Sequence, residues 1–337
     1  MLIGKHTIFG IGNPLIDIVI NVQEEDLIRL EMNKGTMELV SGDHQLEIIK
    51  YFKGANIFYS PGGSAPNTII ACSGLGIGSF IQGKIGNDKF GSIYLDQIKN
   101  SGVRSGIIQS DGATGSSIVL VTPDGERTMN THLGLCREFS AEDLDMDTLA
   151  KSRYLYFTGY MWDTETQKSA LKKAISVCKK NDIKIVFDVA DPFVVNRNKL
   201  EFLNMLKNSI DIVFANKPEM EILFNNKNIE NSVKKIMQYV TSGAIKLGEE
   251  GAIVFDNDVY YRTLARPVEV LDTTGAGDMF AAGFLSSLTR KIPLDRAGKI
   301  ATYLAGEIIK VNGAQISKKK IEIIKAEVFS SHYEFKF

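Results

Sequence analysis

The architecture of this chain can be inferred from one stretch, Asp272-Thr273-Thr274-Gly275-Ala276-Gly277-Asp278. An apolar run, Val268 to Leu271, comes before it and predicts a β-strand. Met279 to Leu288 follows it, and the apolar residues there recur at helical spacing. The pattern therefore predicts a strand, a glycine-rich turn and a helix. The first N–H groups of such a helix have no intrahelical partners and lie at the positive end of the helix dipole, so they favour a bound anion.

The residues of the turn itself fit a phosphate site with a base beside it. Gly275 and Gly277 let a phosphate come close to the backbone, and Asp278 places a carboxylate next to it. That carboxylate repels a phosphate, so it needs a separate role. As a general base it could take the proton of an acceptor hydroxyl while the hydroxyl oxygen attacks the γ-phosphorus of ATP. A tight helix start with an aspartate in its first turn is the alternative explanation.

The full string resembles the signature of the ribokinase or PfkB family of small-molecule kinases, in which DTxGAGD is followed by FxxGF, here Phe280 to Phe284. The resemblance implies that the N–H groups of Gly275, Ala276 and Gly277 form the anion site and that Asp278 is the base. It also implies a ribokinase-like three-layer α/β/α fold, with a mostly parallel central sheet and a small β-sheet lid. Residues 1–337 would form one kinase domain.

The charge balance and the cysteine content of the chain limit which partners and which compartment we expect. The 337 residues include 39 Lys+Arg and 40 Asp+Glu, a formal net charge of −1, so neither nucleic acid nor an anionic membrane is the expected partner. The three cysteines, Cys72, Cys136 and Cys178, form no CxxC pair and are expected to be buried in a protein of a reducing compartment. No signal peptide is recognised in Met1 to His6, and we expect a cytoplasmic protein, as a monomer or a homodimer.

Polar residues follow the first predicted strand, Thr7 to Ile11. Gly10 and Gly12 suggest a dinucleotide fingerprint, but Leu15 stands where its third glycine belongs, so we exclude one. Asn13 and Asp17 instead lie where open α/β sheets bind ligands, and a carboxylate there can accept hydrogen bonds from adjacent sugar hydroxyls. A solvated Asx turn is the alternative. Gly12 to Asp17 resembles the GNxxxD element that holds ribose in the adenosine kinase branch of the family.

Two segments interrupt the βα repeat, at about residues 14–40 and 113–134. The second reads as a hairpin, Ser117 to Thr122 and Arg127 to His132 around a Pro-Asp-Gly turn. In the family such insertions combine as a lid that excludes water from the phosphoryl group. Arg127 resembles a lid arginine that contacts the transferring phosphates; a surface charge on a strand is the alternative.

A second glycine-rich loop, Gly62 to Asn67, comes before a helix-like segment that runs to Leu75. It resembles the family's GGSxxN element, which places Gly63, Ser64 and Asn67 at the acceptor. A plain glycine turn is the alternative. A Walker A spacing at Gly78 to Lys84 is rejected, because Ile85 stands where Ser or Thr would hold Mg²⁺.

From about residue 152 apolar strands alternate with amphipathic helices, which predicts a parallel sheet covered on both faces. After one of these strands, Asn216-Lys217-Pro218-Glu219 reads as a capped helix start. The same residues resemble the family's NxxE motif, in which Glu219 would act on Mg²⁺ through water; the two interpretations are compatible.

Two weaker resemblances concern residues that would bind ATP or a cation. Lys246, Gly248 and Gly251 match the family's (T/K)xGxxG element, which lies along ATP, although alone they read as a hairpin turn. Asp272 and Thr274 resemble positions that bind an activating monovalent cation such as K⁺ in many members.

The acceptor is the open question. The element at Asn13 and Asp17 and the strings Lys34 to Met37 and Arg127 to Thr131 are most similar to bacterial adenosine kinase-like members. The resemblance implies transfer from ATP to the 5′-hydroxyl of adenosine, with Mg²⁺, in purine salvage. The alternatives are a sugar kinase of the same family and a non-catalytic binding module, which the intact Asp278 and its glycines disfavour. Tyr160 or Trp162 could stack on a base or belong to the core.

Overall fold

The computed structural model describes residues 7–330. Residues 1–6, where no signal peptide was recognised, lie outside the described residues, and so does the end of the chain, residues 331–337.

A mostly parallel sheet forms the centre of the molecule, as predicted. Strands β14 to β7 pair in parallel, and β15 and β16 extend one edge through antiparallel pairs. In spatial order the strands are β16 (Val259–Thr263), β15 (Ala252–Asp256), β14 (Ser242–Lys246), β13 (Ile212–Asn216), β12 (Lys184–Asp188), β11 (Tyr154–Thr158), β1 (Ile8–Ile11), β5 (Ser79–Gln82) and β7 (Arg104–Ser105).

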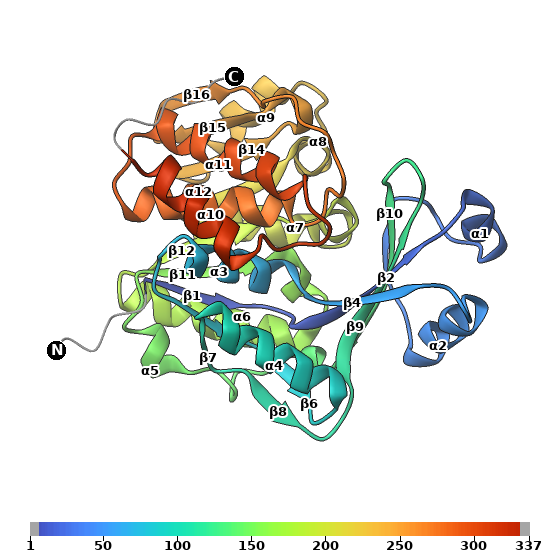
Figure 1. Ribbon diagram of the computed structural model, residues 1–337. Coiled ribbons are helices and arrows are strands. Elements are labelled where there is room, and N and C mark those ends of the chain that lie inside the picture. Colours follow the sequence, from blue (N-terminus) through green and yellow to red (C-terminus); the bar gives the residue numbers. More distant parts are fainter. Residues whose placement is uncertain (1–6, 331–337) are drawn as a thin grey trace.

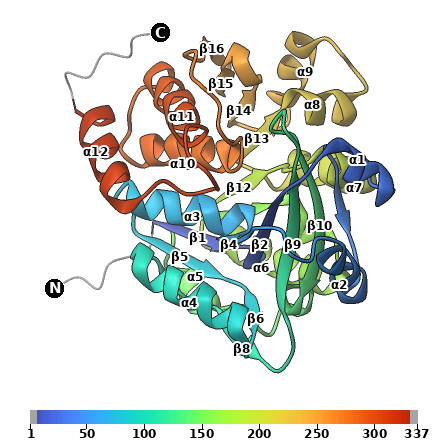
Figure 2. The same ribbon diagram turned by 45° about the vertical axis from the view of Figure 1, so that its right-hand side comes forward.

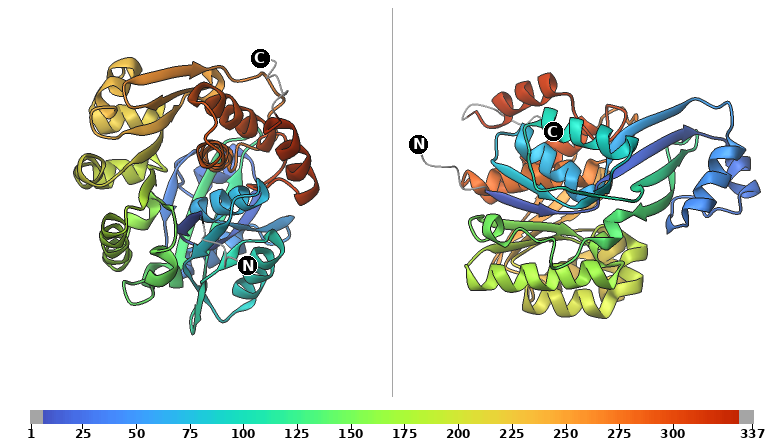
Figure 3. Two further views of the ribbon diagram at one scale, coloured as in Figure 1. Left: turned by 90° about the vertical axis from the view of Figure 1, so that its left-hand side faces the viewer. Right: turned by 90° about the horizontal axis from the view of Figure 1, so that it is seen from below.

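Helices cover both faces of this sheet, which gives three layers (Figure 3). Successive strand residues point to opposite faces, so Tyr156 packs in one core while Leu155 and Phe157 pack in the other. The first face carries α3 (Ser64–Gly74), α4 (Lys89–Ser101), α10 (Ala276–Thr289), α11 (Leu294–Ile308) and α12 (Lys318–Val328). The second carries α5 (Met146–Leu149), α6 (Glu165–Lys180), α7 (Pro192–Asn208), α8 (Lys217–Phe224) and α9 (Ile229–Ile236).

A second sheet of five strands projects to one side of this body (Figure 1). We call it the lid sheet: β3 (Met37–Leu39), β10 (Arg127–Gly134), β9 (Thr114–Val121), β2 (Leu15–Asn21) and β4 (Ile57–Gly62), with α1 (Glu24–Arg29) and α2 (Gly42–Tyr51) in its connections. Four of its strands lie within the two segments predicted from sequence. The fifth, β4, lies outside both and pairs antiparallel with β2. A short pair, β6 (Lys84–Gly86) and β8 (Ile108–Ser110), lies apart from it.

The prediction of a strand directly before the glycine-rich turn is wrong. Residues 264–270 form neither strand nor helix, and the N–H of Leu271 donates to the carbonyl of Ile309, 2.8 Å away, with no strand beside it. The apolar side chains have a different use, because Val268 and Val270 line the large cavity described below. The helix that follows was predicted correctly: α10 is packed between α3 and α11 (Figure 2).

Across residues 7–330, every helix is too short or too polar to pass through a lipid bilayer. The three cysteines are buried and form no disulfide, as the sequence predicted.

Candidate active site

One large cavity, of about 960 Å³, lies between the body and the lid sheet. It is lined by the start of α10, the start of α3, the carboxyl ends of β12, β13 and β14, and one face of the lid sheet. Carboxyl ends of parallel strands are where open α/β sheets place their ligands.

The start of α10 has the geometry of an anion site. Gly275 precedes the helix with a φ of 74°, in the left-handed region, and a Cβ there would lie 2.9 Å from the backbone of Ala314. Glycine therefore meets both a conformational and a steric requirement. The first-turn amides of Gly277 and Asp278 lack a carbonyl one turn earlier and are available to a ligand, whereas the N–H of Ala276, also predicted to bind the anion, donates to the Thr273 carbonyl at 3.3 Å.

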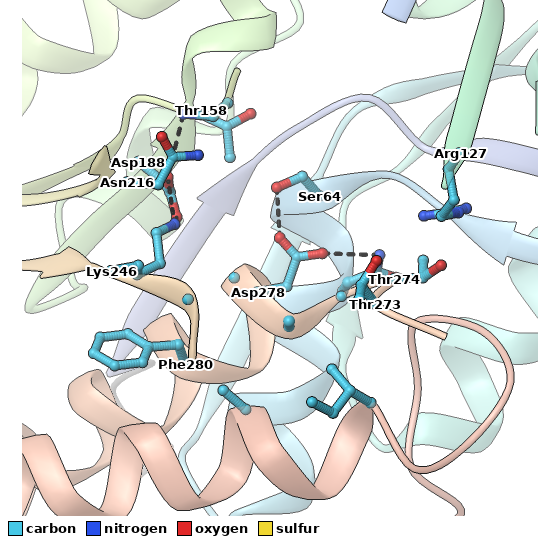
Figure 4. A pocket seen from close by; sticks show the side chains of 18 of the residues that line it. Ser64, Arg127, Thr158, Asp188, Asn216, Lys246, Thr273, Thr274, Asp278 and Phe280 are labelled. Carbon is cyan, nitrogen blue, oxygen red and sulfur yellow. Dashed lines mark hydrogen bonds and ion pairs between the residues drawn. The ribbon is translucent and has the colours of Figure 1, made fainter. Parts of the chain in front are cut away.

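Asp278 is held in place by the second glycine-rich loop. Its carboxylate accepts hydrogen bonds from the Ser64 hydroxyl at 2.6 Å and from Asn67 Nδ2 at 3.1 Å, and Figure 4 shows Ser64 turned toward it. Burial raises the pKa of Asp278 to about 7, against the effect of these two hydrogen bonds. A carboxylate with that pKa is suited to accept a proton at neutral pH.

The second carboxylate, Asp17, lies on β2 of the lid sheet, opposite Ser60 of β4 and beside Gly62 of the same strand. A Cβ on Gly62 would come within 2.3 Å of the Asp17 carboxylate, so the glycine makes room for it. Burial raises the pKa of Asp17 to about 6, Arg127 lowers it and Asp272 raises it further.

Asn13 is fixed by a residue that sequence reasoning missed. The buried Gln167 of α6 donates from Nε2 to Asn13 Oδ1 at 2.6 Å and to the Cys136 carbonyl at 2.7 Å. The carbonyl side of the Asn13 amide is thereby engaged, and Nδ2 remains for a ligand in the cavity that Asn13 lines. Gly63, with a φ of 95°, lies against the backbone of Asn13: a Cβ on Gly63 would be 2.1 Å from the backbone carbonyl oxygen of Asn13.

The helix-cap interpretation of Asn216 and Glu219 is confirmed. The Asn216 side chain accepts from the N–H of Glu219 at 2.9 Å, and Glu219 Oε2 accepts from the N–H of Asn216 at 2.8 Å. Glu219 is fully buried, and its other oxygen, Oε1, has no hydrogen-bond partner. Burial raises its pKa to about 8, although Lys246 lowers it.

Lys246 forms a buried ion pair that the sequence did not reveal. Its Nζ lies 3.3 and 3.2 Å from the two carboxylate oxygens of Asp188, the last residue of β12 (Figure 4). Burial lowers the pKa of Lys246, but the carboxylates of Asp188 and Glu219 outweigh it and the pKa is raised. Gly248 and Gly251 form the turn that follows, both with positive φ, and both line the cavity.

Arg127 reaches the cavity from β10. Its Nε is buried without a hydrogen-bond partner, and the nearest carboxylate oxygen, Asp272 Oδ1, is 4.0 Å away. Asp272 itself accepts from the N–H of Thr274 at 2.8 Å, from the Thr274 hydroxyl, and from the N–H of Gly313 at 2.7 Å. Burial raises the pKa of Asp272, but these hydrogen bonds outweigh it and the pKa is lowered.

The two candidate base-stacking residues, Tyr160 and Trp162, lie in different environments. Tyr160 lines the cavity. Trp162 is buried in the core against Phe202, and its Nε1 donates to Glu201 at 2.8 Å. Trp162 is therefore a packing residue.

The family of the chain follows from comparison with known proteins. The family model described as pfkB family carbohydrate kinase matches residues 43–321. The chain belongs to this pfkB family. It is a phosphotransferase with an alcohol acceptor, as other pfkB-family members are.

The pfkB-family relatives have two kinds of name. A solved probable sugar kinase from Rhizobium etli CFN 42 is 30% identical with a TM-score of 0.91, over 96% of this chain and 99% of that chain. The solved adenosine kinase from Sinorhizobium meliloti is 32% identical with a TM-score of 0.89, over 94% and 98%. The adenosine kinase of Dictyostelium discoideum is 26% identical, over 92% of this chain and 97% of its own.

Most of the residues singled out in the sequence surround one cavity of this pfkB-family kinase. Those that line it are Asn13, Asp17, Gly63, Ser64, Asn67, Arg127, Asn216, Lys246, Gly248, Gly251, Thr274, Gly275, Ala276, Gly277 and Asp278. Glu219 and Asp272 do not line it. Asp188 does, and sequence reasoning missed it.

Kinases of the pfkB family use ATP with Mg²⁺. The buried Oε1 of Glu219 has no hydrogen-bond partner, but Glu219 does not line the cavity, so its contact to that ion through water remains a prediction. The oxygens of Asp272 are already engaged by Thr274 and Gly313, so the monovalent cation remains a prediction. No group of three or more His, Cys, Asp or Glu suited to a metal occurs in the described part of the chain.

Proposed function

We propose that this kinase transfers the γ-phosphoryl group of ATP to the 5′-hydroxyl of a nucleoside, with adenosine as the foremost candidate. The observation that supports a nucleoside is the apolar wall of the cavity on the lid side. Because side chains alternate along a strand, one face of the lid sheet contributes its odd-numbered residues. The apolar ones that line the cavity are Leu15, Met37, Leu39, Met129 and Leu133.

An apolar wall suits a base better than a free sugar. A sugar carries hydroxyls on nearly every carbon, and hydroxyls pressed against apolar side chains lose their hydrogen bonds to water without replacement. A purine presents flat apolar faces and a polar edge. The hydroxyls of Ser117 and Thr131, 2.8 Å apart on the same lid face, lie in position to bond such an edge.

The chemistry would proceed by direct transfer. Asp17 and Asn13 orient the sugar of the acceptor so that its primary hydroxyl faces Asp278. Asp278 takes the hydroxyl proton as the oxygen forms a bond to the γ-phosphorus, the bond from that phosphorus to the bridging oxygen breaks, and ADP leaves. The first-turn amides of α10 and the Arg127 guanidinium stabilise the charge on the phosphates. Bound Mg²⁺, near Glu219, would neutralise part of that charge.

A sugar acceptor is the second candidate. A relative of 30% identity is named as a probable sugar kinase, and Asp17 could accept hydrogen bonds from adjacent hydroxyls of a free sugar as well as of a ribose. Both candidates use the same phosphate machinery, so only the acceptor separates them.

The test is ADP release with ATP and Mg²⁺ across adenosine, inosine, guanosine, cytidine, ribose, fructose and fructose 6-phosphate. We expect turnover of adenosine well above that of the free sugars. Turnover of a free sugar with no turnover of any nucleoside would overturn the nucleoside assignment and leave the phosphate machinery intact.

A further inference from the structure

Three neighbouring strands end at one side of the cavity with polar residues. Strands β12, β13 and β14 lie side by side in the sheet, and their last residues are Asp188, Asn216 and Lys246. Asp188 and Lys246 reach past Asn216 to each other, with Nζ 3.2 Å from Asp188 Oδ2. The side chains are 3% and 17% exposed, so this ion pair is nearly dehydrated.

The ammonium of Lys246 also faces the start of α10. A Cβ added to Gly277 would lie 3.1 Å from Nζ, which is the single contact within 4 Å of that position. The positive end of the α10 dipole, its free amides and a lysine ammonium therefore converge on the same volume. Figure 4 shows the Lys246 ammonium joined to Asp188 on one side of the cavity and Asp278 joined to Ser64 on the other.

A buried ion pair contributes little to the free energy of unfolding. Dehydrating both charges offsets most of their attraction, and apolar replacements of similar size are often as stable. The pair therefore needs another reason, and the reason must lie with what meets the exposed side of Lys246.

The resemblance of Lys246 to the family's nucleotide element already implies that it lies along ATP, and we propose that Asp188 is the positioning residue that holds the Lys246 ammonium at a phosphate oxygen of ATP, at the start of α10. The inference rests on the proposed phosphoryl transfer from ATP, and it does not depend on the acceptor. Lys246 gives up no proton in the reaction. It provides a fixed positive charge beside the phosphorus–oxygen bond that breaks, where preorganised charge stabilises the transition state.

Asp188 acts by restricting the lysine. A lysine side chain has a long flexible stem and a compact charge, so without a fixed partner its ammonium samples many positions. Paired with Asp188, the ammonium stays near Gly277 before ATP arrives. Asp188 also accepts a hydrogen bond from the N–H of Ala190, at 3.2 Å, which fixes the carboxylate in turn.

The test is a double-mutant cycle with Lys246→Met and Asp188→Asn, followed by kcat and KM for ATP and for the acceptor. Loss of one preorganised donor typically costs about 10²–10³ in kcat. We expect that loss for Lys246→Met, and about tenfold or more for Asp188→Asn, in both cases with little change in the KM of the acceptor. Asp188→Glu should recover part of the loss.

The double variant separates the two roles that the pair could have. If Asp188 acts through Lys246, the double variant is no worse than Lys246→Met, within about threefold, because the single variants are coupled. If the pair is only structural, removing both charges together restores activity, and that result would overturn the proposal. So would an Asp188→Asn variant within threefold of the wild type in kcat/KM for ATP.

A matched control exists at the opposite end of the same strand. Lys184 begins β12 and pairs with Asp211 at 2.8 Å, with the lysine side chain 55% exposed and far from the cavity lining. Lys184→Met should leave every kinetic constant unchanged. Thermal unfolding of all variants, and ADP binding by calorimetry, then show whether a loss of turnover arises in a folded protein. If Asp188→Asn does not fold, Asp188→Glu and Lys246→Met still test the proposal.

Discussion

The cavity has two sides that are built differently. On the body side the groups that would meet ATP are backbone amides, a helix start and strand ends, all set in buried elements. On the lid side the groups that would meet the acceptor are side chains on one face of a projecting sheet, from which Arg127 alone would reach the phosphates. Backbone geometry is hard to change by single substitutions, whereas alternating strand side chains can be replaced one at a time. We infer that the body fixes the reaction and the lid sheet selects the acceptor.

The largest effect is expected on the body side. Asp278→Asn keeps the shape of the side chain and its place beside Ser64, but removes the base. We expect kcat to fall by about 10²–10⁴ while ATP binding is retained. Steady-state kinetics with a calorimetric Kd for ATP measures both. A variant within threefold of the wild type in kcat would exclude Asp278 as the base.

The matching change on the lid side, Asp17→Ala, should lower kcat/KM for the acceptor. Asp17→Ala removes the carboxylate that would hold the sugar hydroxyls, and hydrogen bonds to charged groups contribute about 1.5–3 kcal/mol. We expect kcat/KM for the acceptor to fall by roughly 10–100-fold, with KM for ATP unchanged. Asp43→Ala, at an exposed position of α2, is the control. Unchanged affinity for every acceptor would contradict the sugar site.

The carboxylates of Asp278 and Asp17 should also titrate at different pH values. Burial raises the pKa of Asp278 to about 7 and that of Asp17 to about 6. Both act as carboxylates, so activity is present at high pH and is lost as pH falls through these values. We expect kcat at saturating acceptor to fall about tenfold from pH 8 to pH 6, with the midpoint near 7. The residual rate of Asp278→Asn should lose this dependence, and an unchanged limb in that variant would assign it to another group.

The smallest effect tests the apolar wall. Met129→Ala removes part of the surface on which a base would lie, and a loss of about 1 kcal/mol of apolar contact corresponds to roughly fivefold. We expect KM for the nucleoside to rise by about that factor, with kcat and KM for ATP unchanged. Ile118→Val, buried on the opposite face of the neighbouring lid strand β9, is a control for general damage to the lid. An equal rise in the KM of both variants would show no specific role of the wall.

The motifs that could be predicted from sequence are local ones. The turn at Gly275 to Asp278, the loop at Gly63 to Asn67 and the cap at Asn216 and Glu219 each depend on residues within one helix start. Their glycines, caps and helical periodicity are visible over a few positions. The structure has a helix at each of these places.

The features that were missed or wrong depend on contacts between distant segments. Asp188 is a single aspartate at a strand end, and it meets Lys246, 58 residues later, only because β12 and β14 flank β13. Gln167 reaches Asn13 across 154 residues. The run Val268 to Leu271 is mostly apolar like a strand, but the side chains of Val268 and Val270 line a cavity and the run pairs with no strand. Period and propensity carry no information on such pairings.

The most direct test of the account is ³¹P NMR of a reaction that contains the enzyme, ATP, Mg²⁺ and adenosine. The account predicts that a 5′-phosphomonoester of adenosine and ADP appear in equal amounts, and that Asp278→Asn gives neither at a comparable rate. ADP with free inorganic phosphate and no phosphorylated adenosine, or a phosphate on another hydroxyl of the ribose, would contradict it.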